Sequence, residues 1–175
     1  MCGIYLTNIA VSQKAVEEKL NKIKFRGPDN LGVIQKKNIS IGHLRLSILD
    51  LEERSNQPFL FQHLSLVYNG EIYNFKEVRS MLLEEGYSFE TTSDTEVLLK
   101  GYHAWGERVL DRINGMFAFA IYDENNQTVF IARDRLGVKP LYYSWQNGKL
   151  ELCSQLAPLN KGDLNQEAIS IYLQT

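Results

Sequence analysis

Cys2 places a thiol next to the start of the chain. Removal of Met1 would leave this thiol and a free α-amine on the same residue. An α-amine has an ordinary pKa of about 7.7 to 8.0, so near neutral pH part of it is uncharged and can accept the thiol proton. The pair predicts nucleophilic catalysis without histidine, although a cysteine at position two can also be incidental. A thiol–imidazole pair with His43 is a weaker hypothesis, because no papain-like sequence surrounds Cys2.

The tetrapeptide Tyr-Asn-Gly-Glu at residues 68–71 has two interpretations. It follows an apolar stretch, so it predicts an Asn-Gly hairpin turn between strands at residues 64–68 and 72–75. Alternatively, it predicts an oxyanion hole. The Asn69 side-chain amide and the Gly70 N–H would then donate to a substrate carbonyl oxygen, which can approach closely because glycine has no side chain.

Several charged residues could bind an amino acid. Arg45 lies in a largely apolar segment, where a buried guanidinium needs a carboxylate from a substrate or from the protein itself. Glu71 and Asp94 are carboxylates that could hold an ammonium group, although Asp94 also suits the first turn of a helix. Arg26 and Asp29 predict a turn in which they either pair with each other or line a site.

Length and composition indicate a single globular domain. The 175 residues are 44% hydrophobic and 23% charged, with a net charge of -2, which favours a packed core and disfavours a nucleic-acid-binding surface. The longest apolar run, residues 116–122, falls short of the roughly 20 residues needed to cross a bilayer. The sequence has no zinc-ligand spacing, phosphate-binding glycine motif or signal peptide. We therefore expect no bound metal, no nucleic-acid or membrane partner, and a cytoplasmic location.

Both strands and helices are predicted to position these side chains. Short runs of branched and aromatic residues predict strands, and apolar residues one turn apart predict helices. The predicted strands are residues 3–7, 31–35, 39–46, 64–68, 117–122, 129–132, 142–145 and 150–153, and the predicted helices are residues 12–23, 75–85, 93–105 and 164–173. Asn147-Gly148 predicts a tight hairpin turn. Strands joined by hairpins, with helices grouped between them, favour an α+β fold with mostly antiparallel sheets.

The helix ends carry signals of their own. Ser12 and Asn74 are predicted N-caps, because their side chains can accept hydrogen bonds from the first free backbone N–H groups. Ser93 together with Glu96 predicts a capping box. Gly86 predicts the end of the helix that starts after Asn74.

Eight segments together resemble the glutaminase domain of asparagine synthetase, in the same order as in that family. They are residues 1–4 (MCGI), 26–29 (RGPD), 42–50 (GHLRLSILD), 57–58 (QP), 68–74 (YNGEIYN), 93–96 (SDTE), 114–120 (NGMFAFA) and 132–143 (ARDRLGVKPLYY). The resemblance covers essentially the whole chain. It implies a class II glutamine amidotransferase with the N-terminal nucleophile hydrolase fold, a four-layer αββα sandwich of two mostly antiparallel sheets.

The resemblance also implies how catalysis would proceed. Cys2 would attack the side-chain amide of L-glutamine, with its own amine as base and later as acid. Asn69 and Gly70 would form the oxyanion hole. A thioester at Cys2, release of ammonia and hydrolysis to glutamate would follow.

Substrate binding is implied in the same way. Arg45 matches the position that binds the α-carboxylate of glutamine, and Glu71 and Asp94 match those that hold its α-ammonium. Ile48 matches a backbone contact to the substrate. No metal or other cofactor is implied for this chain.

Residues 1–160 resemble the glutaminase domain, and residues 161–175 resemble the start of a linker to an absent synthetase domain. In full-length relatives that domain uses ATP and Mg²⁺ and combines the ammonia with aspartate to make asparagine. A homodimer is one candidate assembly. Two alternatives stay open: similar proteins of surface-polysaccharide pathways amidate a sugar carboxylate, and retention of Met1 would favour a catalytically silent domain that only binds glutamine or a partner.

Overall fold

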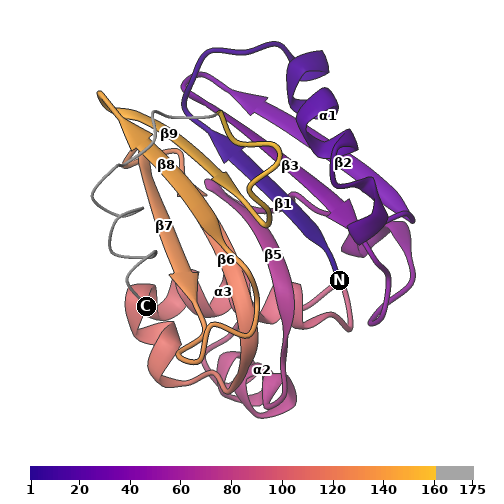
Figure 1. Cartoon of the computed structure of the whole chain (residues 1–175). Helices are drawn as coiled ribbons and strands as arrows, with labels where there is room; N and C mark the ends of the chain where they lie inside the picture. The colour runs from indigo at the N-terminus through magenta and orange to yellow at the C-terminus, as the bar shows by residue number, and fades with distance from the viewer. Residues whose placement is uncertain (161–175) are drawn as a thin grey trace, which may run out of the picture.

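The computed structural model describes residues 1–160, which form two sheets with helices on their outer faces (Figure 1). The strands are β1 (Gly3–Thr7), β2 (Asn30–Lys36), β3 (Ile39–Arg45), β4 (Phe59–Phe61), β5 (Leu64–Ile72), β6 (Gly115–Asp123), β7 (Thr128–Arg133), β8 (Tyr142–Gln146) and β9 (Lys149–Cys153). The helices are α1 (Gln13–Asn21), α2 (Phe75–Glu84) and α3 (Asp94–Trp105), with short 3-10 helices η1 (Lys24–Arg26), η2 (Glu53–Ser55) and η3 (Gly106–Asp111). The predicted helix at 164–173 and the predicted linker lie outside the described residues.

The two sheets are antiparallel throughout the described part of the chain. Sheet A has the strand order β2-β3-β1-β9-β8, and sheet B has the order β4-β5-β6-β7. The predicted α+β class is therefore confirmed. The short strand β4 was not predicted. Within residues 1–160, no helix is long and apolar enough to cross a bilayer.

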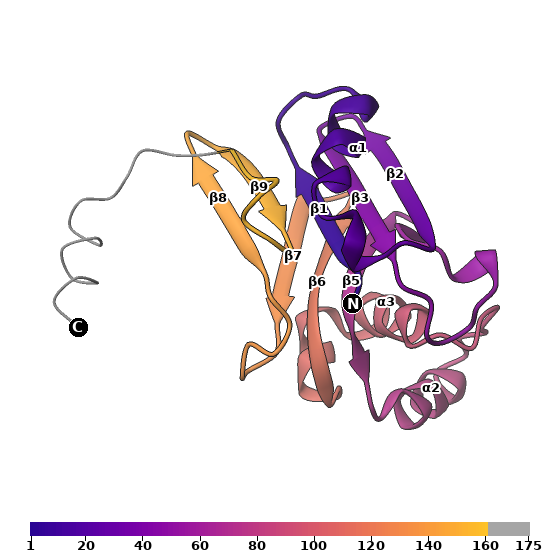
Figure 2. The same ribbon diagram turned by 45° about the vertical axis from the view of Figure 1, so that its right-hand side comes forward.

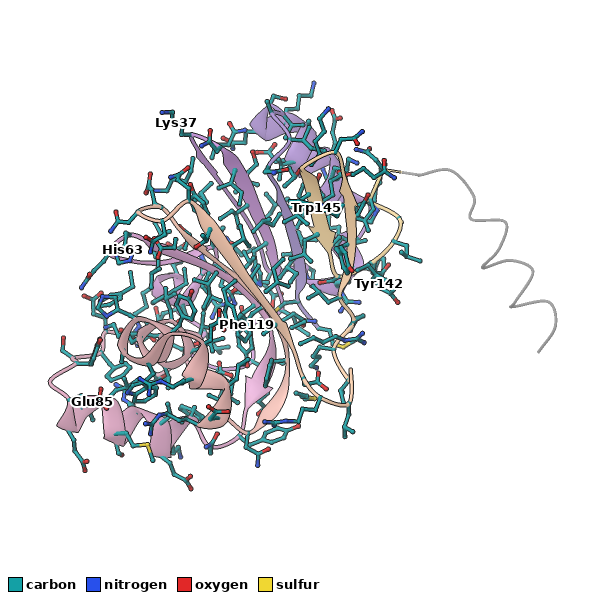
Figure 3. The ribbon with its side chains drawn as sticks, turned by 90° about the vertical axis from the view of Figure 1, so that its left-hand side faces the viewer. Lys37, His63, Glu85, Phe119, Tyr142 and Trp145 are labelled. Atoms are coloured by element: carbon teal, nitrogen blue, oxygen red, sulfur yellow. The ribbon has the colours of Figure 1, made fainter. Side chains whose placement is uncertain are left out.

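Three apolar cores lie between four layers, in the order α1, sheet A, sheet B, and α2 with α3 (Figure 2). Strand β1 shows how the sequence builds them. Ile4 and Leu6 belong to the core between the sheets, whereas Tyr5 belongs to the core under α1, because successive strand side chains point to opposite faces. On sheet B, Phe119 packs in the core against α2 and α3, near the middle of the molecule (Figure 3).

Several local signals are confirmed. Ser12 caps α1, since its hydroxyl oxygen accepts a 3.2 Å hydrogen bond from the N–H of Ala15. Gly86 follows α2 with a φ of 90°, a left-handed conformation that glycine adopts without strain. Asn147 and Gly148 join β8 to β9 with φ values of 50° and 75°, as a tight hairpin turn requires.

The predicted cap at Asn74 is wrong in its hydrogen bonding. Asn74 occupies the N-cap position of α2, but its side chain makes no capping hydrogen bond. Instead, Nδ2 donates to the carbonyl oxygen of Arg112 and Oδ1 accepts from the N–H of Asn114, both at 2.8 Å. The side chain thus connects the start of α2 to the segment before β6. It bonds to these distant backbone groups instead of to the first N–H groups of its own helix.

The predicted capping box is half wrong. Ser93 caps α3 by accepting a 3.1 Å hydrogen bond from the N–H of Thr95. Glu96 does not reach back to Ser93. Its carboxylate accepts from the N–H and hydroxyl of Thr91, both at 2.7 Å, and pairs with the ammonium of Lys100 at 2.6 Å.

Candidate active site

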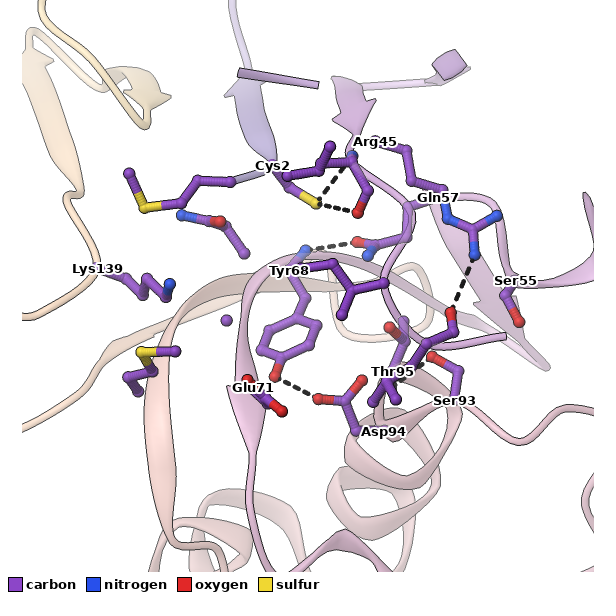
Figure 4. Close-up of a pocket in the computed structure, with 17 residues that line it drawn as sticks. Cys2, Arg45, Ser55, Gln57, Tyr68, Glu71, Ser93, Asp94, Thr95 and Lys139 are labelled. Atoms are coloured by element: carbon purple, nitrogen blue, oxygen red, sulfur yellow. Dashed lines mark hydrogen bonds between the residues drawn. The ribbon is translucent and has the colours of Figure 1, made fainter. Parts of the chain in front are cut away.

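A cavity of about 100 Å³ opens where β1 begins and β3 ends (Figure 4). Antiparallel pairing sets Gly3 opposite Leu44, so the residue before β1 meets the end of β3. The last residues of β5 and the first residue of α3 complete the walls. All seven predicted site residues line this cavity: Cys2, Arg45, Ile48, Asn69, Gly70, Glu71 and Asp94.

Cys2 is held against the segment that follows β3. Its Sγ accepts a 3.4 Å hydrogen bond from the N–H of Leu46 and lies 3.7 Å from the Leu46 carbonyl oxygen, to which the thiol can donate. Burial raises the pKa of the thiol, and the Leu46 N–H only partly offsets this. The thiol is therefore protonated near neutral pH and needs a base to become a nucleophile.

Arg26 and Asp29 make hydrogen bonds to the backbone next to the cavity but do not line it. Arg26 Nε donates a 3.0 Å hydrogen bond to the Cys2 carbonyl oxygen, and Asp29 Oδ2 accepts from the N–H of Ser47 at 2.7 Å. The two charged groups form no ion pair with each other among residues 1–160. The predicted pairing of Arg26 with Asp29 and the predicted lining of the site by these residues are therefore both wrong, and each residue instead holds the backbone of a neighbouring segment.

The amino terminus lies at the same cavity, because Met1 contributes to its lining. Burial lowers the pKa of the Met1 amine, the Cys2 thiolate opposes this, and the positive charges of Arg26 and Lys139 lower the pKa further. The environment at this end of the cavity thus favours the uncharged form of an amine. With Met1 in place, however, the nitrogen of Cys2 is an amide and has no basic lone pair.

Arg45 is almost fully buried, with 5% of its surface exposed, and it lacks a negatively charged partner. Nη1 donates to the Glu52 carbonyl oxygen at 3.0 Å and to Asn56 Oδ1 at 2.8 Å. Nη2 donates to the carbonyl oxygens of Leu49 and Asp50. All of these acceptors are neutral, and within residues 1–160 Arg45 forms no ion pair. Its charge is therefore available to a carboxylate ligand.

Asn69 and Gly70 lie inside β5, so the hairpin interpretation of this tetrapeptide is wrong. They pair with Ala118 and Phe117 of β6 as part of a continuous ladder. Asn69 Nδ2 is buried and has no hydrogen-bond partner in the described part of the chain. A Cβ on Gly70 would collide with the Met116 carbonyl oxygen, so only glycine fits. An unpaired amide donor beside a glycine is the arrangement that an oxyanion needs.

Glu71 and Asp94 lie on the wall of the cavity away from Arg45 (Figure 4). Asp94 is 4% exposed, and its Oδ2 accepts from the Tyr68 hydroxyl at 2.7 Å and from the Ile72 N–H at 3.0 Å. Burial raises the pKa of Asp94, and both hydrogen bonds lower it. Two carboxylates on one side and a guanidinium on the other complement the two charged groups of an α-amino acid.

Other residues of the cavity wall were not predicted as site residues. Gln57 Oε1 accepts a 2.6 Å hydrogen bond from the N–H of Tyr68, which fixes β5 beside the cavity. Ser55 Oγ is buried without a partner among the described residues. Lys139 also reaches the cavity. Gln57 and Lys139 fall within segments that carry the family resemblance, which was the available signal, whereas nothing local marks Ser55.

Residues 1–175 match the family model described as the glutamine amidotransferase domain. The chain belongs to this family.

Curated relatives extend beyond the amidotransferase domain. The putative asparagine synthetase (glutamine-hydrolyzing) 2 of Methanocaldococcus jannaschii is 36% identical over 98% of this chain and 39% of its own length. Asparagine synthetase (glutamine-hydrolyzing) 3 of Bacillus subtilis is 36% identical over 89% of this chain and 27% of its own length. The chain thus spans less than half of each of these relatives.

A solved structure confirms the fold of the amidotransferase domain. Glutamine phosphoribosylpyrophosphate amidotransferase from B. subtilis, complexed with ADP and GMP, superposes with a TM-score of 0.76. It covers 87% of this chain and 42% of its own length at 22% identity, which is evidence for the fold alone. Together with the two antiparallel sheets between helical layers, this establishes the N-terminal nucleophile hydrolase fold.

In this amidotransferase domain, His43 does not serve as the partner of Cys2. Its Nε2 lies 3.2 Å from the Tyr68 carbonyl oxygen, and Cys2 Sγ makes its hydrogen bonds with Leu46 instead. Burial lowers the pKa of His43 to about 3, so the ring is neutral. The thiol–imidazole hypothesis is therefore not supported. Among residues 1–160, no group of three or more His, Cys, Asp or Glu side chains could hold a metal ion.

Proposed function

We propose that this domain hydrolyses the side-chain amide of L-glutamine at Cys2. The observation that carries the proposal is the placement of Arg45 and of Glu71 with Asp94 in one cavity with the thiol. A guanidinium without an anionic partner would bind the α-carboxylate, and the two carboxylates would bind the α-ammonium. The side chain of the bound amino acid would then extend toward Cys2 and the unpaired amide of Asn69.

The chemistry would need the α-amine of Cys2, which becomes available when Met1 is removed. This amine would take the thiol proton, and Sγ would attack the amide carbon. Asn69 Nδ2 and the Gly70 N–H would donate to the oxyanion of the tetrahedral intermediate. The protonated amine would return its proton to the leaving nitrogen, which departs as ammonia. The amine would then accept a proton from the water that hydrolyses the thioester to glutamate.

We further propose that the ammonia is used in another domain of a longer protein. The support is that this chain spans only 39% and 27% of two relatives named glutamine-hydrolyzing asparagine synthetases. Aspartate would be the acceptor, with ATP and Mg²⁺ bound by that other domain and no cofactor required in this one. Amidation of a sugar carboxylate would use the same glutamine hydrolysis. The cytoplasmic location and the homodimer stay predictions.

The proposal is tested on protein from which Met1 has been removed, as verified by intact mass. We expect glutamate release from glutamine and, with a glutamine-mimicking diazo ketone, one covalent adduct that maps to Cys2. Cys2→Ala should lose both.

Cys153 provides the matched control, because it is the other cysteine of the chain and is fully buried. Cys153→Ala should keep glutamate release and the adduct. Glutamate release by Cys2→Ala at the wild-type rate would refute the proposal. Saturable binding of glutamine without turnover or adduct in the Met1-free protein would instead establish the silent domain.

A further inference from the structure

Lys139 brings an ammonium group to the cavity without an evident partner. The residue is 8% exposed and lines the cavity together with Met1 and Cys2. Among residues 1–160, its ammonium makes no ion pair. Figure 4 shows the side chain approaching from the side opposite Arg45. The Lys139 Nζ is not among the buried unpaired side-chain atoms of the described residues, so the ammonium keeps contact with water in the cavity and its charge is free to act on a neighbouring group.

The turn before Lys139 is built to fix its position. Asp134 accepts hydrogen bonds from the N–H groups of Phe117 at 3.2 Å, Val138 at 2.8 Å and Lys139 at 3.0 Å. On the other side, Arg133 Nε donates to the Lys139 carbonyl oxygen at 2.6 Å. The backbone of Lys139 is therefore held by two charged side chains at once. Segment 132–143, to which the sequence assigned no role, thus brings one residue, Lys139, to the cavity.

We propose that Lys139 is a positioning residue for the amine that activates Cys2. Its ammonium, held at the cavity by the turn at residues 134–139, favours the uncharged amine, which can accept the thiol proton. The inference rests on the proposed function, because the base in question is the one that glutamine hydrolysis would use. Removal of Met1 would place this amine at the present nitrogen of Cys2.

Other charged and titratable groups also face this amine. They are the Cys2 thiol, Arg26 at the end of η1, Arg45 at the end of β3, Tyr68 and Glu71 on β5, and Asp94 on α3. Arg26 and Arg45 act in the same direction as Lys139, but both donate hydrogen bonds to backbone carbonyl oxygens. Glu71 and Asp94 act in the opposite direction. Without Lys139, less positive charge would offset the effect of the two carboxylates on the amine. The amine would then bind its proton more tightly.

The charge state of the amine can be measured without turnover. In Met1-free protein with ¹³C-labelled cysteine, the Cα shift of Cys2 is followed by NMR as a function of pH. Replacement of Lys139 by Met should raise the pKa of the amine by about 0.5 to 1. Lys139→Arg keeps the charge and should leave this pKa within about 0.2 of the wild-type value.

Arg135→Met is the matched control, because Arg135 is an exposed cation of the same turn. It should leave the pKa of the amine within about 0.2 of the wild-type value, since solvent screens exposed charges. Lys139→Gln is titrated alongside, so that the test does not depend on the folding of one variant. An unchanged amine pKa in Lys139→Met and Lys139→Gln, or an equal rise in Arg135→Met, overturns the inference.

Steady-state kinetics add a readout that a merely structural role would not change. The acid limb of kcat/KM for glutamine should move to higher pH by the same amount as the amine pKa in Lys139→Met, while the plateau at high pH stays within about twofold of the wild type. A uniform loss of kcat/KM at every pH would overturn the inference. Absence of glutamine hydrolysis by the wild type would defeat the proposed function, and the NMR titration would still decide the role of Lys139.

Discussion

Tyr68 donates a 2.7 Å hydrogen bond from its hydroxyl to Oδ2 of Asp94, and this bond joins β5 to the first residue of α3. The N–H of Ile72 donates to the same oxygen at 3.0 Å. Burial raises the pKa of Asp94, whereas these donors lower it. Tyr68 therefore helps to keep the Asp94 carboxylate ionised where an ammonium group would bind.

Replacement of Tyr68 by Phe should weaken glutamine binding. The loss of the donor would raise the pKa of Asp94 further, so KM for glutamine should rise by about 3- to 10-fold, and the defect should grow as the pH falls. The free energy of unfolding should fall by about 1 kcal/mol. Tyr73→Phe is the control, because Tyr73 is 57% exposed. Equal KM values for Tyr68→Phe and the wild type between pH 5 and 7 would contradict this role.

Replacement of Asn69 by Ala should separate activity from stability. The buried Nδ2 has no partner among the described residues, so its removal should change the free energy of unfolding by less than about 1 kcal/mol. Because that donor would stabilise the oxyanion, kcat should fall by about 100- to 1000-fold. Steady-state glutamate release and urea denaturation measure the two quantities.

Asn74→Ala is the control for Asn69→Ala, because it should lower stability and leave activity unchanged. The Asn74 side chain makes two 2.8 Å hydrogen bonds and does not line the cavity. This variant should lose about 1 to 2 kcal/mol of unfolding free energy and keep its kcat. A large loss of kcat in both variants would show that activity follows stability, and the oxyanion role would then fail.

Replacement of Arg45 by Lys should reduce recognition of the α-carboxylate although the charge is kept. A lysine ammonium cannot reproduce the four hydrogen bonds that fix the Arg45 guanidinium at the cavity, so kcat/KM for glutamine should fall by about 10- to 100-fold. The ratio of kcat/KM for glutamine to that for its α-amide should also fall, since the amide lacks the negative charge. Arg54→Lys is the control, because the Arg54 side chain is 52% exposed. An unchanged ratio in Arg45→Lys would exclude a carboxylate contact.

His43 should make stability depend on pH. Burial holds its pKa at about 3 in the folded state against an ordinary value of 6.5, so between these values the unfolded chain binds the additional proton. The stabilisation is complete above pH 6.5 and falls as the pH decreases toward 3, with a loss of about 2 kcal/mol at pH 5. Urea denaturation at pH 5 and 7 measures this difference.

His43→Gln should reduce the pH dependence of stability between pH 5 and 7. The control is His63→Gln, because the His63 side chain is 28% exposed; it should retain the wild-type difference. If His43→Gln and the wild type lose the same free energy of unfolding between pH 7 and pH 5, another group is responsible.

Local patterns in the sequence determined much of the framework. The short run of branched and aromatic residues at 3–7 predicted β1, Ser12 and Gly86 marked helix ends, and Asn147-Gly148 marked a hairpin turn. These features depend on residues a few positions apart, so their physical causes are contained in short segments. The identity of the chemical groups was also readable, because Cys2 and the charged residues at 45, 71 and 94 could be named without coordinates.

Only the tertiary structure decided how the site is assembled. A turn at Asn69-Gly70 is locally favourable, but pairing with β6 along all of β5 kept these residues in an extended strand. In the same way, Asn74 bonds across to Arg112 and Asn114 rather than to its own helix. The sequence by itself thus determined the elements and the reactive groups. Long-range backbone pairing and burial decided which groups meet, because these terms involve partners far apart in the chain and outweigh local preferences of about 1 kcal/mol.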